Sequence, residues 1–313
     1  MKYILKRLSR SLLTLVVVVT VVFLLMRMMP VEGYFGASFD KLDEAQKVAK
    51  LDNLGLLDPW YIQLKNFYTD LLNGDLGESI TYRPKVAITK ILGDKLLTSL
   101  RFGVISLSVS LVLGLSLGVL MARFKGKFWD KLGTTYVVGI NAVPAIIYYL
   151  LIQVYLTTIF SLPLLYDKSN PKSMILPIMC LSLGSIAYYA MWIRRYMVDE
   201  LNKDYVRLAR AKGLNNKDIM IKHVMRNAFV PMAQYLPASI LYTVSGSIYV
   251  ESLFSIPGTG GLLVTAIQRQ DNTLVQALVL LYSSIGIVGL MLGDILMATF
   301  DPRIKLSHEG GSR

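Results

Sequence analysis

The chain has little of what enzymes and metal-binding proteins use for their chemistry. Its 313 residues include one cysteine, Cys180, and two histidines. A disulfide within the chain is therefore impossible, and without a Cys-x-x-Cys pair or a Cys/His cluster no structural zinc site is expected. The sequence has no G-x-x-x-x-G-K-[ST] phosphate-binding loop. Two histidines and one cysteine, far apart, also give little support to an enzyme embedded in a membrane.

Charged residues are scarce as well. They make up 17% of the chain, against about 25% in ordinary soluble domains, while 54% of the residues are hydrophobic. Long stretches carry no charge, and Lys and Arg collect between them, which is typical of a helical membrane protein. The net charge of +12 does not indicate nucleic-acid binding, because the basic residues flank apolar runs as the positive-inside rule requires.

The apolar runs predict an all-α, polytopic membrane protein with about six transmembrane helices. Each run can cross a hydrocarbon core about 30 Å thick at about 1.5 Å of rise per residue. Backbone groups in lipid must bond within their own segment, so the spans are expected to be helices. The expected spans are residues 8–29, 97–122, 135–160, 174–193, 230–254 and 274–300.

The N-terminal run has the basic start and apolar core of a secretory signal, but no A-x-A site precedes Pro30. We interpret it as an uncleaved first helix. With a cytoplasmic N-terminus, most Lys and Arg residues fall in inner segments, and six spans bring the C-terminus back inside. This divides the chain into a first helix (1–30), an extracytoplasmic segment (31–94), a transmembrane core (95–300) with an inner loop (194–229), and a cytoplasmic tail (301–313).

The extracytoplasmic segment is expected to be a small folded cap, because residues 41–50 and 60–72 are helix-like and Asp58-Pro59 and Asn73-Gly74 indicate turns. Within the spans, Asn141 and Pro144 predict a kink. The GxxxG patterns at Gly114/Gly118 and Gly289/Gly293 either allow close helix contact or reflect the general glycine content of membrane helices.

The inner loop has the pattern of two short helices joined at a glycine. Residues 204–212 show helical spacing, and Gly213 stands where a left-handed residue ends a helix. Asn215 or Asn216 can cap a second helix that runs through Ile219 and His223. Such an amphipathic elbow suits docking into a groove on a partner, or it is a basic helix lying on the membrane surface. The residues alone do not favour either of these two alternatives over the other.

The loop resembles the "EAA" loop of ABC-importer permeases, in the oligopeptide, dipeptide and nickel branch, whose variant reads much like Y-V-R-x-A-R-A-K-G-L. It departs from the general pattern, since Arg207, Leu208 and Ala209 stand where Glu-Ala-Ala is usual, and Met225 and Arg226 replace Leu-Pro. Other stretches are similar to the same branch, and within it to the B-type subunit of oligopeptide permeases. They are 54–60, 74–77, 249–260, Asp294 and 301–303.

The resemblance implies a type I ABC importer transmembrane fold with no catalytic activity and no cofactor of its own. ATP and Mg would be bound by two partner ATP-binding subunits, alongside a second homologous permease subunit and an extracytoplasmic substrate-binding protein. The elbow would be the coupling helix that rests in an ATPase cleft. The residues implied in coupling are Tyr205, Arg207, Leu208, Ala209, Arg210, Ala211, Lys212, Gly213, Leu214, Ile219 and His223.

A substrate path is marked only by polar residues in the fifth expected span. Gln234, Tyr242, Ser245 and Glu251 would suit peptide backbones if they face a cavity, or they bond to neighbouring helices. The expected cargo is an oligopeptide or dipeptide, with nickel or another small solute as the alternative. Glu251 and Asp294 would instead be ion sites in an ion-coupled secondary transporter, but that class needs a mid-membrane carboxylate and usually a repeat, and neither is evident.

Overall fold

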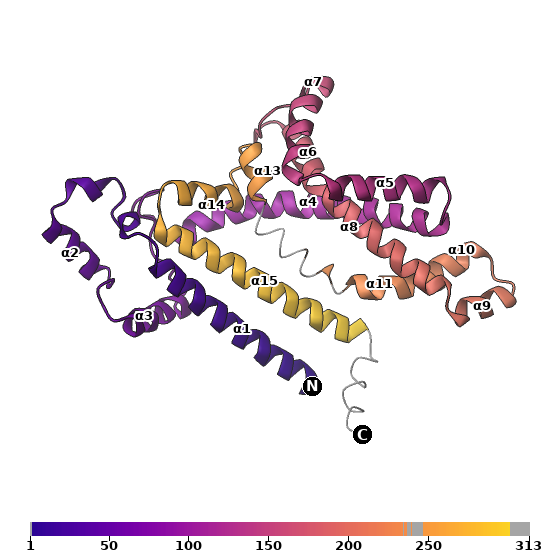
Figure 1. Cartoon of the computed structure of the whole chain (residues 1–313), viewed down its shortest axis with the longest axis horizontal. Coiled ribbons are helices and arrows are strands. Elements are labelled where there is room, and N and C mark those ends of the chain that lie inside the picture. The colour runs from indigo at the N-terminus through magenta and orange to yellow at the C-terminus, as the bar shows by residue number, and fades with distance from the viewer. Residues whose placement is uncertain (1, 234, 237–238, 240–246, 301–313) are drawn as a thin grey trace.

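The computed structural model describes residues 2–233, 235–236, 239 and 247–300. Every regular element in these ranges is a helix (Figure 1), apart from one isolated bridge between Glu78 and Ala87. The all-α prediction is therefore confirmed. Four described helices are long and apolar enough to cross a membrane, and a bent pair would make a fifth.

The four long helices form two pairs. Helices α1 (Lys2–Arg27) and α15 (Asn272–Phe300) lie side by side, and α4 (Ile88–Arg123) packs against α8 (Ile175–Leu201) (Figure 1). These helices confirm the first, second, fourth and sixth predicted spans. The second span is longer than predicted, because the turns from residue 88 are also helical.

That extension has a physical cause that hydropathy misses. Lys90, Asp94 and Lys95 interrupt the apolar run, yet Ile88 and Ile91 on the same turns are buried in a core cluster shared with α1, α14 (Thr259–Gln268) and α15. Protein packing rather than lipid holds this part of α4. Helix α14 itself was not predicted.

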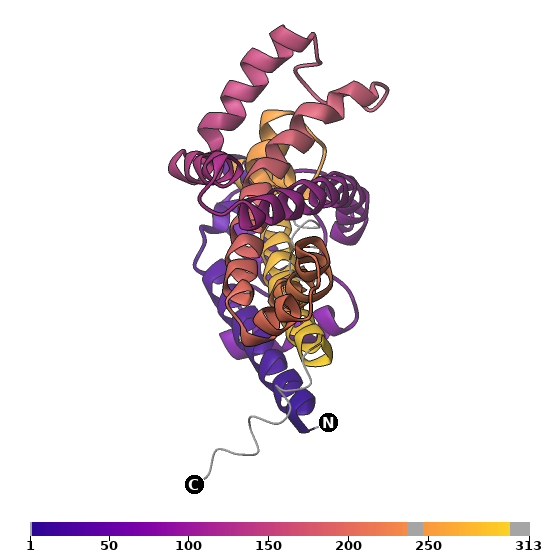
Figure 2. The ribbon, with the colours of Figure 1, turned by 90° about the vertical axis from the view of Figure 1, so that its right-hand side faces the viewer.

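The predicted kink is confirmed and is sharp. Helix α5 (Phe128–Ala142) and the helical arm Ala145–Phe160 meet at 105°, where Pro144 lacks an N–H to donate and acts as the N-cap of the arm. The arm consists of α6 (Ala145–Leu151), a π-helix (Ile152–Leu156) and α7 (Thr157–Phe160). It projects from the body of the molecule (Figure 2) and contacts α13 (Ile248–Leu253), where the Gln153 side-chain amide donates to the Leu253 carbonyl at 2.9 Å.

The fifth predicted span, 230–254, is wrong as one continuous helix. Helix α11 (Arg226–Ala233) enters it, but α13 (Ile248–Leu253) begins anew at Ser247, whose backbone is extended and whose side chain accepts a hydrogen bond from the Val250 amide. Such a cap supplies a first-turn donor with the partner that a continuous helix would provide.

The segment between α1 and α4 is folded, with helices where the sequence predicted them. Helix α2 (Glu44–Asn53) starts with a capping box between Asp43 and Gln46, and α3 (Trp60–Leu72) starts directly after Pro59. Short 3₁₀ turns at Val31–Tyr34 and Gly36–Lys41 precede them. Gly74 has φ +75° after α3, as a turn there requires.

A stripe of small residues explains how closely α4 and α8 approach. Ser106, Ser110, Gly114 and Gly118 recur at every fourth position of α4. A Cβ atom added at Gly118 would lie 2.1 Å from the Ile193 side chain, so no larger residue fits there without movement. The close contact predicted for Gly114/Gly118 is present.

Candidate functional site

The elbow, residues 204–225, follows directly from the end of α8. Its first arm is α9 (Asp204–Ala211). The Leu214 amide donates to the Ala209 carbonyl (3.2 Å) and the Gly213 amide to the Arg210 carbonyl (2.9 Å), which is the bond pair of a Schellman motif. Gly213 has φ +77°, a conformation that a Cβ disfavours. The predicted glycine stop is therefore present.

The second arm begins at an asparagine cap, as predicted. The Asn215 side-chain oxygen accepts hydrogen bonds from the amides of Lys217 (2.7 Å) and Asp218 (3.1 Å). The helix runs through α10 (Asn216–Asp218) and a π-helix, Ile219–Met225, into α11. The two arms thus meet at a short turn, residues 212–215.

Apolar side chains on the inner faces of both arms hold the elbow to α8. Val206 is 0% exposed and Ala209 is 7% exposed, and they share a core cluster with Ile219, Val224 and the α8 residue Met197. Burying one such aliphatic side chain contributes about 1.5–3 kcal/mol. Ala209 and Ile219, both predicted coupling residues, therefore position the elbow from within.

A tyrosine fixes the base of the first arm. The Tyr205 hydroxyl donates to the Glu200 carboxylate at 2.6 Å. Burial and this carboxylate raise the pKa of Tyr205 to about 12, so it remains a neutral donor at physiological pH. His223 is half-buried on the second arm.

The outer face of the elbow combines positive charge with exposed apolar side chains. Leu208 is 57% exposed and Leu214 is 42% exposed. Asp218 pairs with Lys222 at 2.9 Å, and this hydrogen bond holds the pKa of Asp218 below its usual value. The predicted coupling residues that are exposed are Arg207, Leu208, Arg210, Ala211, Lys212, Gly213 and Leu214. Sequence reasoning missed Ile221, which is 52% exposed beside them.

An ion pair ties α8 to the α4–α5 turn and was not predicted. The Arg194 guanidinium donates to both carboxylate oxygens of Asp130, at 2.5 and 2.8 Å, and the Gly126 amide donates to the same carboxylate at 2.7 Å. Asp130 is only 5% exposed. A two-point contact of this kind restricts rotation as well as separation, so α5 and α8 are expected to move together.

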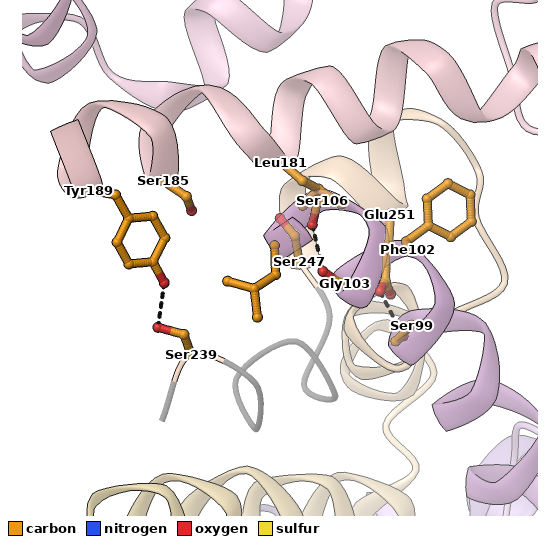
Figure 3. A pocket seen from close by; sticks show the side chains of 11 residues that line it. Ser99, Phe102, Gly103, Ser106, Leu181, Ser185, Tyr189, Ser239, Ser247 and Glu251 are labelled. Carbon is orange, nitrogen blue, oxygen red and sulfur yellow. Dashed lines mark hydrogen bonds between the residues drawn. The ribbon is translucent and has the colours of Figure 1, made fainter. Parts of the chain in front are cut away.

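A cavity of about 280 Å³ lies at the centre of the helices, between α4, α8 and α13 (Figure 3). Hydroxyl groups dominate its polar wall, and the Tyr189 hydroxyl donates to the Ser239 hydroxyl at 2.9 Å. Among the described residues that line it, none is Lys, Arg or His. The residues around the cavity are Ser99, Phe102, Gly103, Ser106, Leu107, Leu181, Ser185, Tyr189, Ser239, Ser247 and Glu251.

Of the predicted substrate-path residues, Glu251 is at this cavity, whereas Gln234, Tyr242 and Ser245 lie outside the described residues. The side chain of Asp294 is likewise outside the described part of the chain. Sequence reasoning missed Ser99, Ser106, Ser185 and Tyr189. Their signal was helical spacing, seven residues apart on α4 and four apart on α8, within otherwise apolar runs.

Both oxygens of Glu251 are occupied by donors within the protein. One accepts from the Ser99 hydroxyl at 2.8 Å, and the other accepts from the Gly260 amide at 2.7 Å and the Gly261 amide at 3.1 Å. Glu251 is 3% exposed. The carboxylate therefore caps the N-terminus of α14 from α13, where negative charge is favoured, and joins both to α4 through Ser99.

Known proteins are similar to this chain over nearly its whole length. Two dipeptide transport system permease proteins named DppB match it, one from Lactococcus lactis subsp. cremoris (strain MG1363), 34% identical over 97% of this chain and 99% of that protein. The other, from Bacillus subtilis (strain 168), is 31% identical over 99% of both chains. The oligopeptide transport system permease protein AmiC of Streptococcus pneumoniae is 38% identical over 67% of this chain, which spans only 42% of AmiC.

A solved structure has the same fold. A crystal structure of an amino acid ABC transporter with histidines aligns with a TM-score of 0.52 at 17% identity, over 69% of this chain and 94% of that one. Residues 114–306, which include the elbow, match the family described as the inner membrane component of binding-protein-dependent transport systems. The chain belongs to this family of binding-protein-dependent inner membrane transport components.

Proposed function

We propose that this chain is one transmembrane subunit of an ATP-driven importer that carries peptides across the cell membrane. The observation that carries the proposal is the continuity of α8. This single helix places Ser185 and Tyr189 at the central cavity and ends at the elbow, with Met197 in the elbow core. A force applied to the elbow therefore reaches the cavity through one rigid element.

The mechanism follows from these connections. The N-terminus, the elbow and the C-terminus lie on the cytoplasmic side, where Lys and Arg are concentrated. When ATP closes a pair of ATPase subunits, the elbow moves with the cleft that holds it. Because Asp130 and Arg194 join α5 to α8, and small residues join α4 to α8, these helices tilt as one body and switch the cavity between the two sides.

The elbow also indicates the chemistry of its partner. Leu208 and Leu214 would enter an apolar groove, and Arg207, Arg210 and Lys212 would face carboxylates at its rim. One chain presents one elbow, so a second homologous permease supplies the other and two ATP-binding subunits are needed. An extracytoplasmic binding protein delivers the cargo to the outer side.

Peptides are the cargo that the cavity and the relatives support. Hydroxyl groups can both donate to and accept from peptide N–H and C=O groups without selecting one side chain. The DppB proteins are named for dipeptide transport, and AmiC for oligopeptide transport.

Reconstitution tests the proposal. The chain is co-expressed with the neighbouring genes, purified, and placed in liposomes that contain ATP, and the uptake of labelled dipeptides and oligopeptides is compared with that of nickel. We expect peptide uptake that requires ATP and the binding protein. Transport by the chain alone, without ATPase subunits, would contradict an ATP-driven importer, and uptake of nickel without peptides would contradict the cargo.

A further inference from the structure

Helix α3 does not lie beyond the membrane end of α1 but contacts the side of α1 through Phe67 and Tyr68. The Phe67 ring packs on the Phe23 ring, with 4.8 Å between centroids. The Tyr68 hydroxyl lies 2.7 Å from the Thr20 hydroxyl and donates to the Val16 carbonyl at 3.0 Å. These contacts join α3 to the apolar part of α1.

The contacts set the depth of α3. The apolar stretch of α1 covers Leu8–Arg27. At about 1.5 Å of rise per residue, Phe23 lies about 6 Å, Thr20 about 10 Å and Val16 about 16 Å from Arg27 along the helix axis. The Tyr68 side chain can extend along α1 toward the membrane centre, so the α3 backbone lies nearer to Arg27 than Val16 does. Even so, the backbone of α3 near Phe67 lies on the membrane-centre side of Arg27.

A second contact places the end of α1 level with the start of α15. The Asn272 side-chain amide donates to the Pro30 carbonyl at 3.1 Å, and Asn272 is the first residue of α15. The end of one apolar helix and the start of the other thus lie at one level. Helix α3, which contacts α1 on the apolar side of that level, lies at the depth of the adjoining leaflet.

The two flanks of α3 differ in the way this depth requires. Gln63, Asn66 and Asp70 line a cavity of about 200 Å³ that α15 also borders, so the polar flank faces protein. On the other flank, Tyr61 and Leu72 are three helical turns apart and share a face, and they are 59% and 85% exposed.

Both α3 and α1 expose large side chains. Trp60 at the start of α3 is 64% exposed, and Trp and Tyr are the residues that concentrate at membrane interfaces. Lys65, beside Tyr61, is long enough to extend its amine toward headgroups. On α1, the exposed apolar residues include Leu12, Leu13, Val16, Val17, Val21, Leu24 and Leu25.

We propose that α3 is an interfacial helix embedded in the leaflet next to the outer segment, with Trp60, Tyr61 and Leu72 in contact with phospholipid. The outer segment is then held at the membrane surface by α3 rather than being a cap surrounded by water. This inference rests on the membrane position of α1 and not on the cargo or on ATP coupling.

Site-directed fluorescence tests this position. In the full chain, purified with the subunits that accompany it and bearing Cys180→Ala, single cysteines replace Leu72 or Tyr61 and carry a bimane label. The protein is placed in phospholipid nanodiscs, and quenching is measured with nitroxides on shallow or deep acyl-chain positions and with aqueous iodide. Val48→Cys on α2 and Val17→Cys on α1, each 52% exposed in the native chain, are the matched controls.

We expect the labels at positions 72 and 61 to be quenched severalfold more strongly by the shallow nitroxide than the label at 48, and less by iodide. The label at 17 should respond best to the deep nitroxide. Strong iodide quenching at both α3 sites, equal to that at position 48, would overturn the proposal. Protection from iodide and from both nitroxides would also overturn it, because a protein rather than lipid would then cover α3.

Discussion

The Ser79 hydroxyl donates a 2.6 Å hydrogen bond to the Asp271 carboxylate, although 192 residues separate the two in the chain. The same carboxylate accepts from the amides of Ile80, Thr81 and Tyr82, at 2.9–3.2 Å. It also accepts from the Leu274 amide at the start of α15. One buried side chain therefore fastens the outer segment to the first turn of α15.

This contact makes the outer segment sensitive to acid. Burial alone would raise the pKa of Asp271, but the hydrogen bonds from Ser79 and the amides of Tyr82, Thr81 and Ile80 outweigh it and hold the pKa below the ordinary value of 3.8. A lowered pKa in the folded state stabilises the fold at neutral pH, and this stabilisation declines as the pH falls below about 4. The hydrogen-exchange protection factors of residues 79–82, which divide the intrinsic exchange rate at each pH by the measured rate, should therefore fall on acidification.

The control is Asp271→Asn, which keeps the shape but not the charge. Its amide group would meet backbone donors, so we expect faster exchange in 79–82 already at neutral pH and a loss of the acid-dependent part. If residues 79–82 of this variant respond to acid as they do in the native protein, the response arises from a titratable group other than Asp271.

The glycines around Glu251 offer a matched pair of substitutions. A Cβ atom at Gly258 would lie 2.4 Å from the Glu251 carboxylate and 2.5 Å from the Ser99 hydroxyl, whereas at Gly261 the nearest atom would be 3.5 Å away. We expect Gly258→Ala to lower the thermal unfolding midpoint of the purified protein and Gly261→Ala to leave it nearly unchanged. Equal unfolding midpoints for the two variants would mean that the groups around Glu251 can move to accommodate the methyl group without a loss of stability.

The contact between α4 and α8 predicts a similar contrast. Gly118→Ala would force its new methyl group against Ile193 and the Ala190 carbonyl, and overpacking of this kind costs about 1–3 kcal/mol. Gly139 on α5 has no atom within 4 Å of such a methyl group. Denaturation in detergent should therefore show a loss of stability for Gly118→Ala and none for Gly139→Ala.

The elbow turn predicts which residues can replace Gly213. Proline fixes φ near −65° and removes the amide that donates to Arg210, so Gly213→Pro should abolish ATP-dependent uptake while the protein remains inserted. Asparagine adopts the left-handed conformation more readily than other residues, and no neighbour crowds the site. Gly213→Asn should therefore retain most of the uptake. Normal uptake by Gly213→Pro would contradict our account of coupling.

The docking role of the elbow can be separated from folding. Leu208→Glu places a carboxylate on the exposed face that would enter the ATPase groove, so we expect the ATPase subunits to be lost on affinity purification. Leu57→Glu, at a position with similar exposure (53% against 57%) in the outer segment, should leave the complex intact. If Leu208→Glu retains the ATPase subunits, the elbow is not their docking surface.

Local chemistry explains what could be predicted from the sequence. Gly213, Asn215 and Pro144 act on backbone groups within a few residues, so their effects are visible in a short stretch of sequence. Val206 shows the limit of this approach, because the helical spacing of residues 204–212 grouped Leu208 with Ala209 and did not select Val206. The tertiary fold buries Val206 and exposes Leu208.

Long-range partners explain what could not be predicted. Asp130 and Asp271 are single carboxylates without a local motif, and their partners lie 64 and 192 residues away. The serines of the cavity wall come from two helices whose pairing depends on the small residues of α4. Ser247 ends the predicted fifth span because its side chain caps α13, a choice that hydropathy does not detect.

The π-helix at Ile219–Met225 has a consequence for insertions and deletions. A π turn contains about one residue more than an α turn, so removing one residue there would leave a regular α-helix with its hydrogen bonds intact. Because the π turn and the α turn each complete about 360°, everything that follows would keep nearly the same orientation around the axis relative to the first arm. The orientation of the helices beyond the elbow would therefore tolerate the loss of one residue from this π-helix, whereas the loss of one residue from a regular α turn would rotate everything that follows by about 100°.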